Sequence, residues 1–156
     1  MRVAALVVLL AGVLVPVRAS AQANYQTRLT LSGFSGAFPT PTVADLDAGA
    51  VAAGSQLTFT ITNVAKKTVR TATIYIAASS ATLGGTKPSS DVEWKLSTSS
   101  TYTPLSTTNA LVGTYNVPTT VGQTVSTNLD LRMRVYWTNL PAAYSGANLV
   151  ITMTVP

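Results

Sequence analysis

Alternation of apolar and polar side chains is the feature that most constrains what this chain can fold into. Over residues 125–137 apolar side chains occupy nearly every second position, and most positions between them are polar or charged. A β-strand sends successive side chains to opposite faces, so this pattern separates a buried face from a solvated one. A helix would place Leu129, Arg132 and Met133 on one side and bring charge into the core. The stretch is therefore predicted to be a long strand, with Trp137 on its buried face.

The same period of two recurs in other parts of the chain. Clear alternation marks residues 25–31, 56–62, 70–78, 91–97 and 148–155, and a weaker pattern marks 111–117 and a possible edge segment at 43–51. Many of the outward positions carry Thr, a β-branched residue that suits a pleated sheet. Gly49 and Gly54 argue against a helix in the small-residue stretch 44–53. Because the link 63–68 is short, residues 56–62 and 70–78 are predicted to form a hairpin.

Seven or eight short strands separated by turn residues indicate an all-β fold. Gly, Pro, Ser and Asn gather between the alternating segments, as expected of surface turns. We therefore expect an antiparallel immunoglobulin-like β-sandwich, with a barrel as the alternative architecture. Uneven loop lengths favour the sandwich, and residues 22–156 are expected to form a single domain.

The first 21 residues have the pattern of a secretory signal peptide. Arg2 supplies a positive charge, an apolar run follows over residues 4–15, and Ala19-Ser20-Ala21 offers a small-residue cleavage site. A membrane-spanning helix needs about 20 apolar residues, so the run is too short for an anchor. We expect cleavage after Ala21 and a protein secreted to the bacterial periplasm, cell surface or extracellular space, with no membrane span left after the leader is removed.

Composition excludes several kinds of chemistry. The chain has no Cys and no His, and only 10% of its residues are charged. Disulfides, thiol nucleophiles, zinc–thiolate sites and His-activated serines are therefore absent. Loss of Arg2 and Arg18 with the leader leaves eight basic residues against five acidic ones, a net charge of +3. Because those basic residues are scattered, nucleic-acid binding is not expected. Neither an enzymatic activity, nor a cofactor, nor a resident metal is predicted.

Two acidic pairs deserve weighing as candidate sites. Asp45 and Asp47 could contribute to a calcium site, but two carboxylates supply few of the six to eight oxygens that calcium needs. We interpret them as solvated acids on an edge strand. Asp91 and Glu93 share the outward face of one predicted strand, a spacing that glycoside hydrolases also use. The preferred interpretation is a set of exposed cross-strand charge pairs with the outward pair on the long strand, Arg132 and Arg134.

Aromatic residues divide into predicted core and predicted surface. Trp94 and Trp137 fall on the apolar faces of their strands and are expected in the core. Outward or loop tyrosines can stack on sugars or contribute to an interface. The candidate ligand-binding residues are Tyr75, Tyr136 and Tyr144, and Tyr144 could instead tie down a corner through its hydroxyl.

The end of the chain resembles a known group of secreted proteins. The turn Asn139-Leu140-Pro141-Ala142-Ala143-Tyr144-Ser145-Gly146, followed by the strand at 149–155, is similar to the ending of bacterial pilin-like and spore-coat-U-like sandwich domains. That resemblance implies subunits of extracellular fibres or coats that assemble by strand exchange and catalyse nothing. Those families usually carry a disulfide, which a chain without Cys does not form.

Two functions are compatible with the sequence. The first is a non-catalytic, secreted structural or adhesive β-sandwich, a subunit of a surface or extracellular assembly whose partners are other proteins or itself. The alternative is a small secreted module that binds a glycan or another cell-surface ligand. The segment 25–31 could add to the edge of another subunit, but we expect it to complete the sandwich of its own chain.

Overall fold

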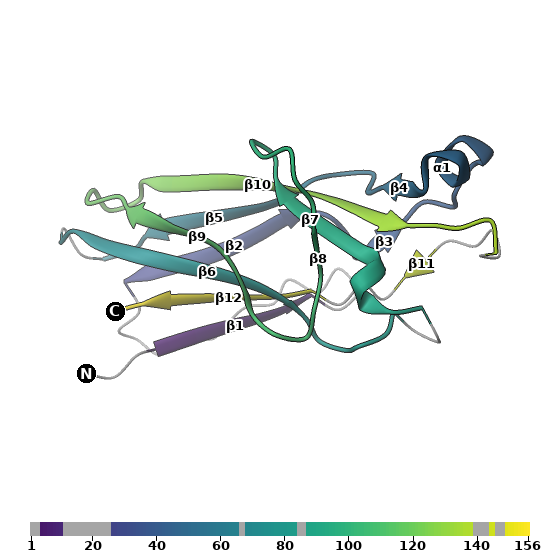
Figure 1. Ribbon diagram of the computed structural model, residues 1–156. Helices are drawn as coiled ribbons and strands as arrows, with labels where there is room; N and C mark the ends of the chain where they lie inside the picture. Colours follow the sequence, from purple (N-terminus) through teal and green to yellow (C-terminus); the bar gives the residue numbers. More distant parts are fainter. Residues whose placement is uncertain (1–3, 11–25, 66–67, 84–86, 139–143, 146–148) are drawn as a thin grey trace.

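Two antiparallel β-sheets packed face to face make up the protein. The computed structural model describes residues 4–10, 26–65, 68–83, 87–138, 144–145 and 149–156, and the predicted cleavage site after Ala21 lies outside them. Figure 1 shows the strands running along one long direction, with the short helix α1, Val43–Ala48, at one end. The architecture is thus mostly β and sandwich-like, as the alternation predicts.

The larger sheet has six strands. Its order is β2–β5–β10–β7–β8, and the short β4 pairs with the far part of β10. The bounds are Thr27–Gly33 for β2, Ala50–Ala52 for β4, Leu57–Asn63 for β5, Val92–Leu96 for β7, Thr103–Pro104 for β8 and Thr124–Arg134 for β10. The eleven-residue β10 is paired with β5 and β4 on one side and with β7 on the other, so it organises this sheet.

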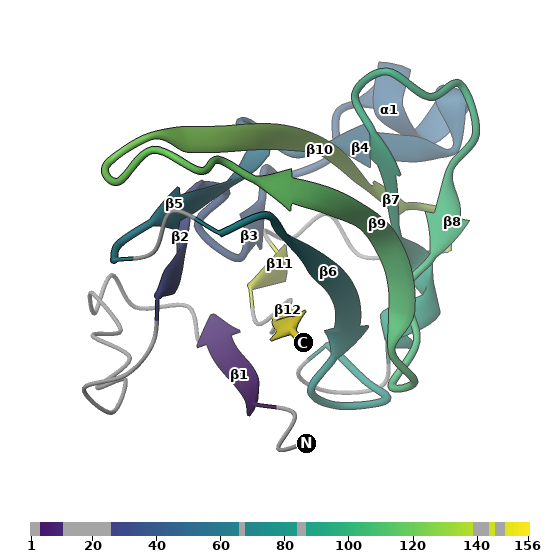
Figure 2. The same ribbon diagram turned by 90° about the vertical axis from the view of Figure 1, so that its left-hand side faces the viewer.

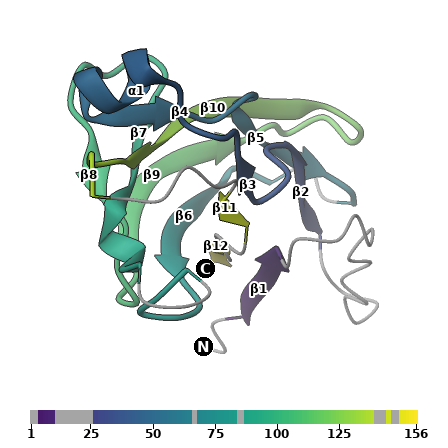
Figure 3. The same cartoon turned by 90° about the vertical axis from the view of Figure 1, so that its right-hand side faces the viewer.

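The smaller sheet is built from β12, β6 and β9 in that order. These strands span Leu149–Val155, Arg70–Ala78 and Ala110–Val117. Strand β1, Ala4–Leu10, runs antiparallel along the outer edge of β12. It lies on the side of the sandwich between β12 and β2 in both end-on views (Figures 2 and 3). A separate two-stranded ribbon joins β3, Ala37–Phe38, to β11, Tyr144–Ser145.

The core lies between the two sheets and follows the alternation. In β5 every second residue is buried, starting with Leu57, and β10 buries Leu129, Leu131 and Met133. Strands β6 and β12 contribute isoleucines and other apolar side chains from the opposite side. Trp94 of β7 is 6% exposed, which confirms its predicted place in the core. Burial of this contiguous apolar surface is the main driving force for a fold that has no disulfide.

The predicted hairpin between residues 56–62 and 70–78 is wrong. Strand β5 belongs to the six-stranded sheet, whereas β6 pairs with β12 and β9 in the other one. The chain therefore crosses from one sheet to the other after Asn63. A short link fits either a hairpin or a crossover between stacked sheets, which pack only about 10 Å apart.

A helix replaces the edge strand expected at residues 43–51. Helix α1 spans Val43–Ala48 and β4 follows it at Ala50–Ala52. Thr42 and Asp45 form a reciprocal capping box, in which each side chain accepts a hydrogen bond from the other residue's backbone N–H. Gly49, with φ of 73°, ends the helix in the left-handed conformation. The glycine that argued against a helix is therefore the residue that terminates one.

Trp137 is not in the core. Strand β10 ends at Arg134, and the next residue, Val135, donates its N–H to the carbonyl of Gly49, the residue just before β4. Val135 is still fully buried, but Trp137 is 63% exposed. The alternation in the sequence continues beyond Arg134, where the strand ends. The prediction that Trp137 lies in the core is therefore wrong.

The segment after the predicted leader lies in the sheet of its own chain. Strand β2 pairs with β5 over its whole length, from Thr27 opposite Asn63 to Gly33 opposite Leu57. Arg70, from the opposite sheet, donates hydrogen bonds to the Thr27 hydroxyl, the Gln26 carbonyl and the Asn63 side chain. This cluster ties the start of β2 to β6 across the end of the sandwich.

Candidate functional site

The outer face of the six-stranded sheet carries most of the charged residues that face one another across strands. In the register of β7 and β10, Glu93 lies opposite Arg132 and Lys95 lies opposite Asp130. Glu93 accepts from Arg132 Nε at 2.7 Å and from Arg134 Nη2 at 2.7 Å. The predicted pairing between the two strands thus occurs for Glu93.

Two details of that predicted pairing are wrong. Glu93 is 1% exposed, so its ion pairs are not solvated, although both arginines remain partly open to solvent. Asp91 does not meet an arginine: it ends the 3₁₀ helix η1, Ser89–Asp91, and pairs with Lys87 at 2.8 Å. Asp91 and Glu93 therefore do not share one outward strand face, because the chain at Asp91 is not yet extended.

Glu93 is buried because other parts of the chain cover this end of the sheet. Strand β8 pairs with β7 and places Pro104 opposite Glu93. The ring of Tyr102, just before β8, stacks on the guanidinium of Arg132 with 3.9 Å between Cζ and the ring centroid. The nearby negative charge of Glu93 raises the pKa of Arg134. A carboxylate taken out of water is stable only when such partners compensate it.

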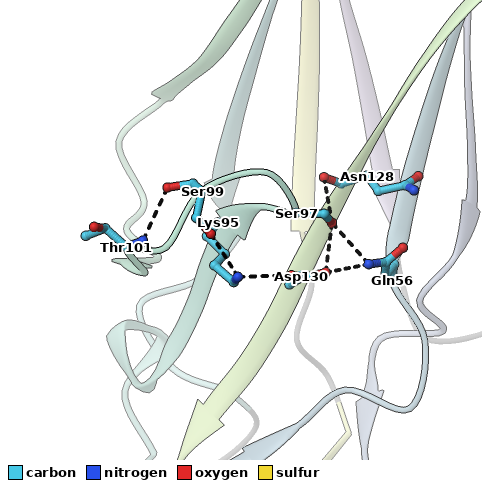
Figure 4. Close-up of polar contacts among 7 residues, drawn as sticks. All are labelled: Gln56, Lys95, Ser97, Ser99, Thr101, Asn128 and Asp130. Carbon is cyan, nitrogen blue, oxygen red and sulfur yellow. Dashed lines mark hydrogen bonds and ion pairs between the residues drawn. The ribbon is translucent and has the colours of Figure 1, made fainter.

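Asp130 forms the centre of a second polar cluster on the same face. Figure 4 shows its carboxylate approached by Gln56, which precedes β5, and by Lys95 and Ser97 at the end of β7. Gln56 Nε2 donates to Oδ1 at 2.6 Å, Ser97 Oγ lies 2.8 Å from the same oxygen, and Lys95 Nζ is 3.3 Å from Oδ2. The hydrogen bond from Ser97 is the main cause that lowers the pKa of Asp130, and Gln56 and Lys95 add to it against the opposing effect of burial. Asp130 is therefore ionised at neutral pH.

A small hollow opens beside this carboxylate. Its volume is about 150 Å³. It lies where the end of β4, the loop before β5, and Tyr102 meet β10. The hollow combines one aromatic ring, one carboxylate, one amide and one hydroxyl with apolar side chains; the lining residues are Ala52, Ala53, Ser55, Gln56, Tyr102, Asp130 and Leu131.

The polar groups around the hollow hold one another in place. The carboxylate of Asp130 is already held by a lysine, an amide and a hydroxyl, so it has no tendency to take up a proton near neutral pH. Lys95 Nζ also donates to the Ser99 carbonyl at 2.9 Å, which fixes the ammonium group. Such a rigid, satisfied set of polar groups presents defined hydrogen-bonding positions at the hollow's edge.

The other acidic pair, Asp45 and Asp47, lies in helix α1 and not on an edge strand. Asp45 is engaged with Thr42, and these hydrogen bonds lower its pKa. Among the described residues no group of three or more His, Cys, Asp or Glu side chains could hold a metal ion. The same part of the chain contains no helix that is long and apolar enough to cross a bilayer.

The three tyrosines predicted to bind a ligand lie on three separate elements. Tyr75 is half-buried on β6, opposite Thr152 of β12, and Tyr136 follows β10 and is 48% exposed. Tyr144 lies on β11 opposite Phe38, and its side chain is outside the described residues. Lys87 Nζ lies 5.8 Å from the ring centroid of Tyr136, so that ring contacts a cation at the edge of the domain.

Sequence reasoning did not find the residues of the hollow. In the sequence, Tyr102 stands in a stretch without alternation, and Gln56 is the first residue of the alternating segment 56–62. They meet Asp130 through contacts between residues 28 to 74 positions apart along the chain. The only local signal was an aromatic residue in a Ser/Thr-rich loop, which is typical of many surface loops.

Comparison with known proteins identifies no relative of this chain. No family model, no curated protein and no solved structure matches the chain. The arguments below therefore rest on its own residues and their arrangement.

Proposed function

We propose that this protein is a non-catalytic, secreted structural subunit with an immunoglobulin-like sandwich, which associates with further copies of itself through the edge of β12. The resemblance of its C-terminal segment to pilin-like and spore-coat-U-like domains points in the same direction. The proposal rests on the order of the strands and on what covers the edge of β12.

The strand order supports the immunoglobulin-like part of the proposal. In such folds strands A, B, E and D form one sheet and C, F and G the other. Here β2–β5–β10–β7 corresponds to A–B–E–D, and β6–β12 corresponds to C–F. Strand β9 pairs with β6 on the side away from β12, where a variable-type domain has its additional strand. The position next to β12 is then that of strand G.

The occupant of the G position is the observation that carries the proposal. The residues beside β12 are Ala4–Leu10, which fall inside the predicted leader. Cleavage after Ala21 would remove them and expose the backbone N–H and C=O groups along one side of β12. Unpaired groups along an edge of seven residues form a template for a strand from another chain.

A second copy is the occupant that we propose. After cleavage, residues 22–26 alone would precede β2, fewer than the seven residues of β12. Strand β2 itself is engaged with β5 and fastened by Arg70. Addition of a strand to the open edge from a neighbouring subunit would restore the missing position and build an assembly from identical parts.

Sedimentation velocity of the chain starting at Gln22 tests the proposal. Lysine at an edge position discourages strand addition, so Thr154→Lys on β12 should block association. Thr73→Lys is the matched control, because Thr73 lies directly opposite Thr154 on the neighbouring β6. We expect the sedimentation coefficient of the unmodified chain and of Thr73→Lys to rise with concentration, and Thr154→Lys to remain a monomer.

Two outcomes would contradict this function. One is an unmodified chain that stays monomeric over the whole concentration range. The other is association of Thr154→Lys equal to that of Thr73→Lys, which would place the contact elsewhere on the surface. Circular dichroism of both variants separates a loss of association from a loss of folding.

A further inference from the structure

We propose that the hollow between Tyr102 and Asp130 binds one sugar ring of an uncharged glycan. The site lies on the outer face of the six-stranded sheet, whereas the proposed contact between subunits lies at the edge of the other sheet. It therefore adds a ligand-binding activity that the assembly function does not require. Three properties of the hollow carry the proposal: its balanced charge, its hydrogen-bonding groups and its aromatic wall.

The charged groups beside the hollow already have partners of opposite charge within the protein. The Asp130 carboxylate is paired with Lys95 at 3.3 Å, and Arg132 beyond it is paired with Glu93 at 2.7 Å. A charged ligand would compete with these pairs and lose its own hydration. A neutral polar ligand gains hydrogen bonds without that cost, so the site favours hydroxyl-bearing molecules over anions and cations.

Two of the polar residues that line the hollow, Gln56 and Asp130, are in direct contact. Gln56 donates its amide N–H to Asp130, and in Figure 4 its carbonyl oxygen points away from that carboxylate. Each carboxylate oxygen can accept more than one hydrogen bond, and the Ser55 hydroxyl both donates and accepts. The neighbouring carboxylate and amide of Asp130 and Gln56 match neighbouring hydroxyl groups of a pyranose ring, and Ser55 adds a hydroxyl to the lining.

The remaining walls match the apolar face of a sugar. Tyr102 lines the hollow while its ring is held by the stack on Arg132, with Lys95 Nζ 5.2 Å from the ring centroid. Ala52 and Ala53 also line the hollow. A cavity of about 150 Å³ holds a benzene-sized ring. The hollow has that volume, so it accommodates one six-membered ring and leaves the rest of a glycan in solvent.

Titration followed by ¹⁵N NMR on the chain starting at Gln22 tests this site. The probes are methyl glycosides of glucose, galactose, mannose and N-acetylglucosamine at millimolar concentrations, with methyl glucuronide as the charged comparison. We expect a neutral glycoside to shift the amide signals of Ser55, Gln56, Tyr102 and Asp130, with a dissociation constant in the millimolar range, and the glucuronide to bind more weakly.

Substitutions locate the binding. Tyr102→Ala and Asp130→Asn are each expected to weaken binding at least about tenfold, a loss of about 1.4 kcal/mol. Tyr136→Ala is the matched control, since Tyr136 is an exposed tyrosine that does not line the hollow. It should leave the affinity unchanged.

Three results would overturn the inference: no shift with any neutral glycoside, shifts that survive both Tyr102→Ala and Asp130→Asn, or shifts that disappear in Tyr136→Ala. Asp130→Asn keeps the shape of the side chain, so it remains informative if Tyr102→Ala perturbs the loop. Association of the subunits is read from sedimentation, so failure of the glycan site and failure of the assembly proposal are separate results.

Discussion

Two carboxylates on the same sheet face, Glu93 and Asp130, have opposite surroundings. Both lie on the paired strands β7 and β10, and each is matched in register with a basic residue. Glu93 is buried, lies opposite Pro104 of the adjacent strand β8, and is held by two arginines, one of which stacks on Tyr102. Asp130 keeps a quarter of its side chain exposed and lies at the edge of a hollow.

Coverage by neighbouring segments explains the difference. The side-chain alternation puts both carboxylates on the outer face, but Glu93 is enclosed by two arginines and has Pro104 opposite it on the neighbouring strand, whereas Asp130 borders the hollow. A covered charge must be compensated and then becomes part of the structure, whereas an open one stays accessible to a ligand. The Glu93 end of the face is therefore expected to govern stability, and the Asp130 end is expected to govern binding.

Removal of Arg132 should give the largest loss of stability. Breaking a buried ion pair costs about 3–5 kcal/mol when a charge is left uncompensated. Arg132 is 37% exposed, and Arg134 would still contact Glu93. We therefore expect Arg132→Met to lower the free energy of unfolding by about 2 kcal/mol, measured by urea denaturation.

Arg28→Met is the control for that change. Arg28 is an exposed arginine on β2, so its replacement should alter stability by less than about 0.5 kcal/mol. Equal effects of the two substitutions would mean that Glu93 does not depend on Arg132, and the contrast between the two ends of the face would fail.

Tyr102 connects the two ends, and its removal should have an intermediate effect. Tyr102→Ala deletes the ring that stacks on Arg132 and opens the Glu93 end to water. Loss of the cation–π contact and of ring burial should cost about 1 kcal/mol. Tyr102→Phe retains the ring and should remain close to the unmodified protein in urea denaturation. A Tyr102→Ala variant as stable as Tyr102→Phe would show that the ring does not protect the ion pairs.

The sequence predicted the inward faces of the strands well, and the outer contacts poorly. Alternation identified β10 and β6, including the buried residues Leu129 and Met133, because the period of two is a local property of the chain. Which strands become neighbours depends on long-range packing. The predicted hairpin between 56–62 and 70–78 is wrong for that reason. Two alternating segments joined by a short link can lie in the same sheet or in two stacked sheets, and the sequence does not distinguish these arrangements.

The alternation gave wrong predictions in two places, the segment that forms helix α1 and the residues just after β10. Thr42 and Asp45 are spaced as a capping box, and Gly49 fits a helix end, yet a six-residue helix is too short for an apolar stripe to reveal it. Trp137 follows the alternating pattern beyond the last residue of β10 and is exposed. The hollow could not be predicted at all, because Gln56, Tyr102 and Asp130 meet only after the sheet has formed.

Asp130→Asn should give the smallest change in stability and the most specific dependence on pH. Because the pKa of Asp130 is lowered in the folded protein, its ionised form stabilises the fold at any pH above its unfolded pKa of about 3.9. That contribution is lost as the pH falls through the lower, folded value. The variant should therefore be less stable than the unmodified chain at pH 7, by less than about 1 kcal/mol.

The difference between the two proteins should then shrink as the pH falls below about 4 and disappear once the pH has passed the lowered pKa of the folded protein, where the native carboxylate is protonated as well. Thermal unfolding from pH 2 to pH 7 measures both curves. Asp47→Asn serves as the control at an exposed carboxylate of α1 away from the hollow, and we expect its curve to follow that of the unmodified protein. A difference in stability between Asp130→Asn and the unmodified chain that stays constant down to pH 2 would mean that the charge of Asp130 does not contribute to the stability of the fold. The ion pair between Asp130 and Lys95 would then add no stability, in contrast to the ion pairs that we expect to stabilise the protein at Glu93.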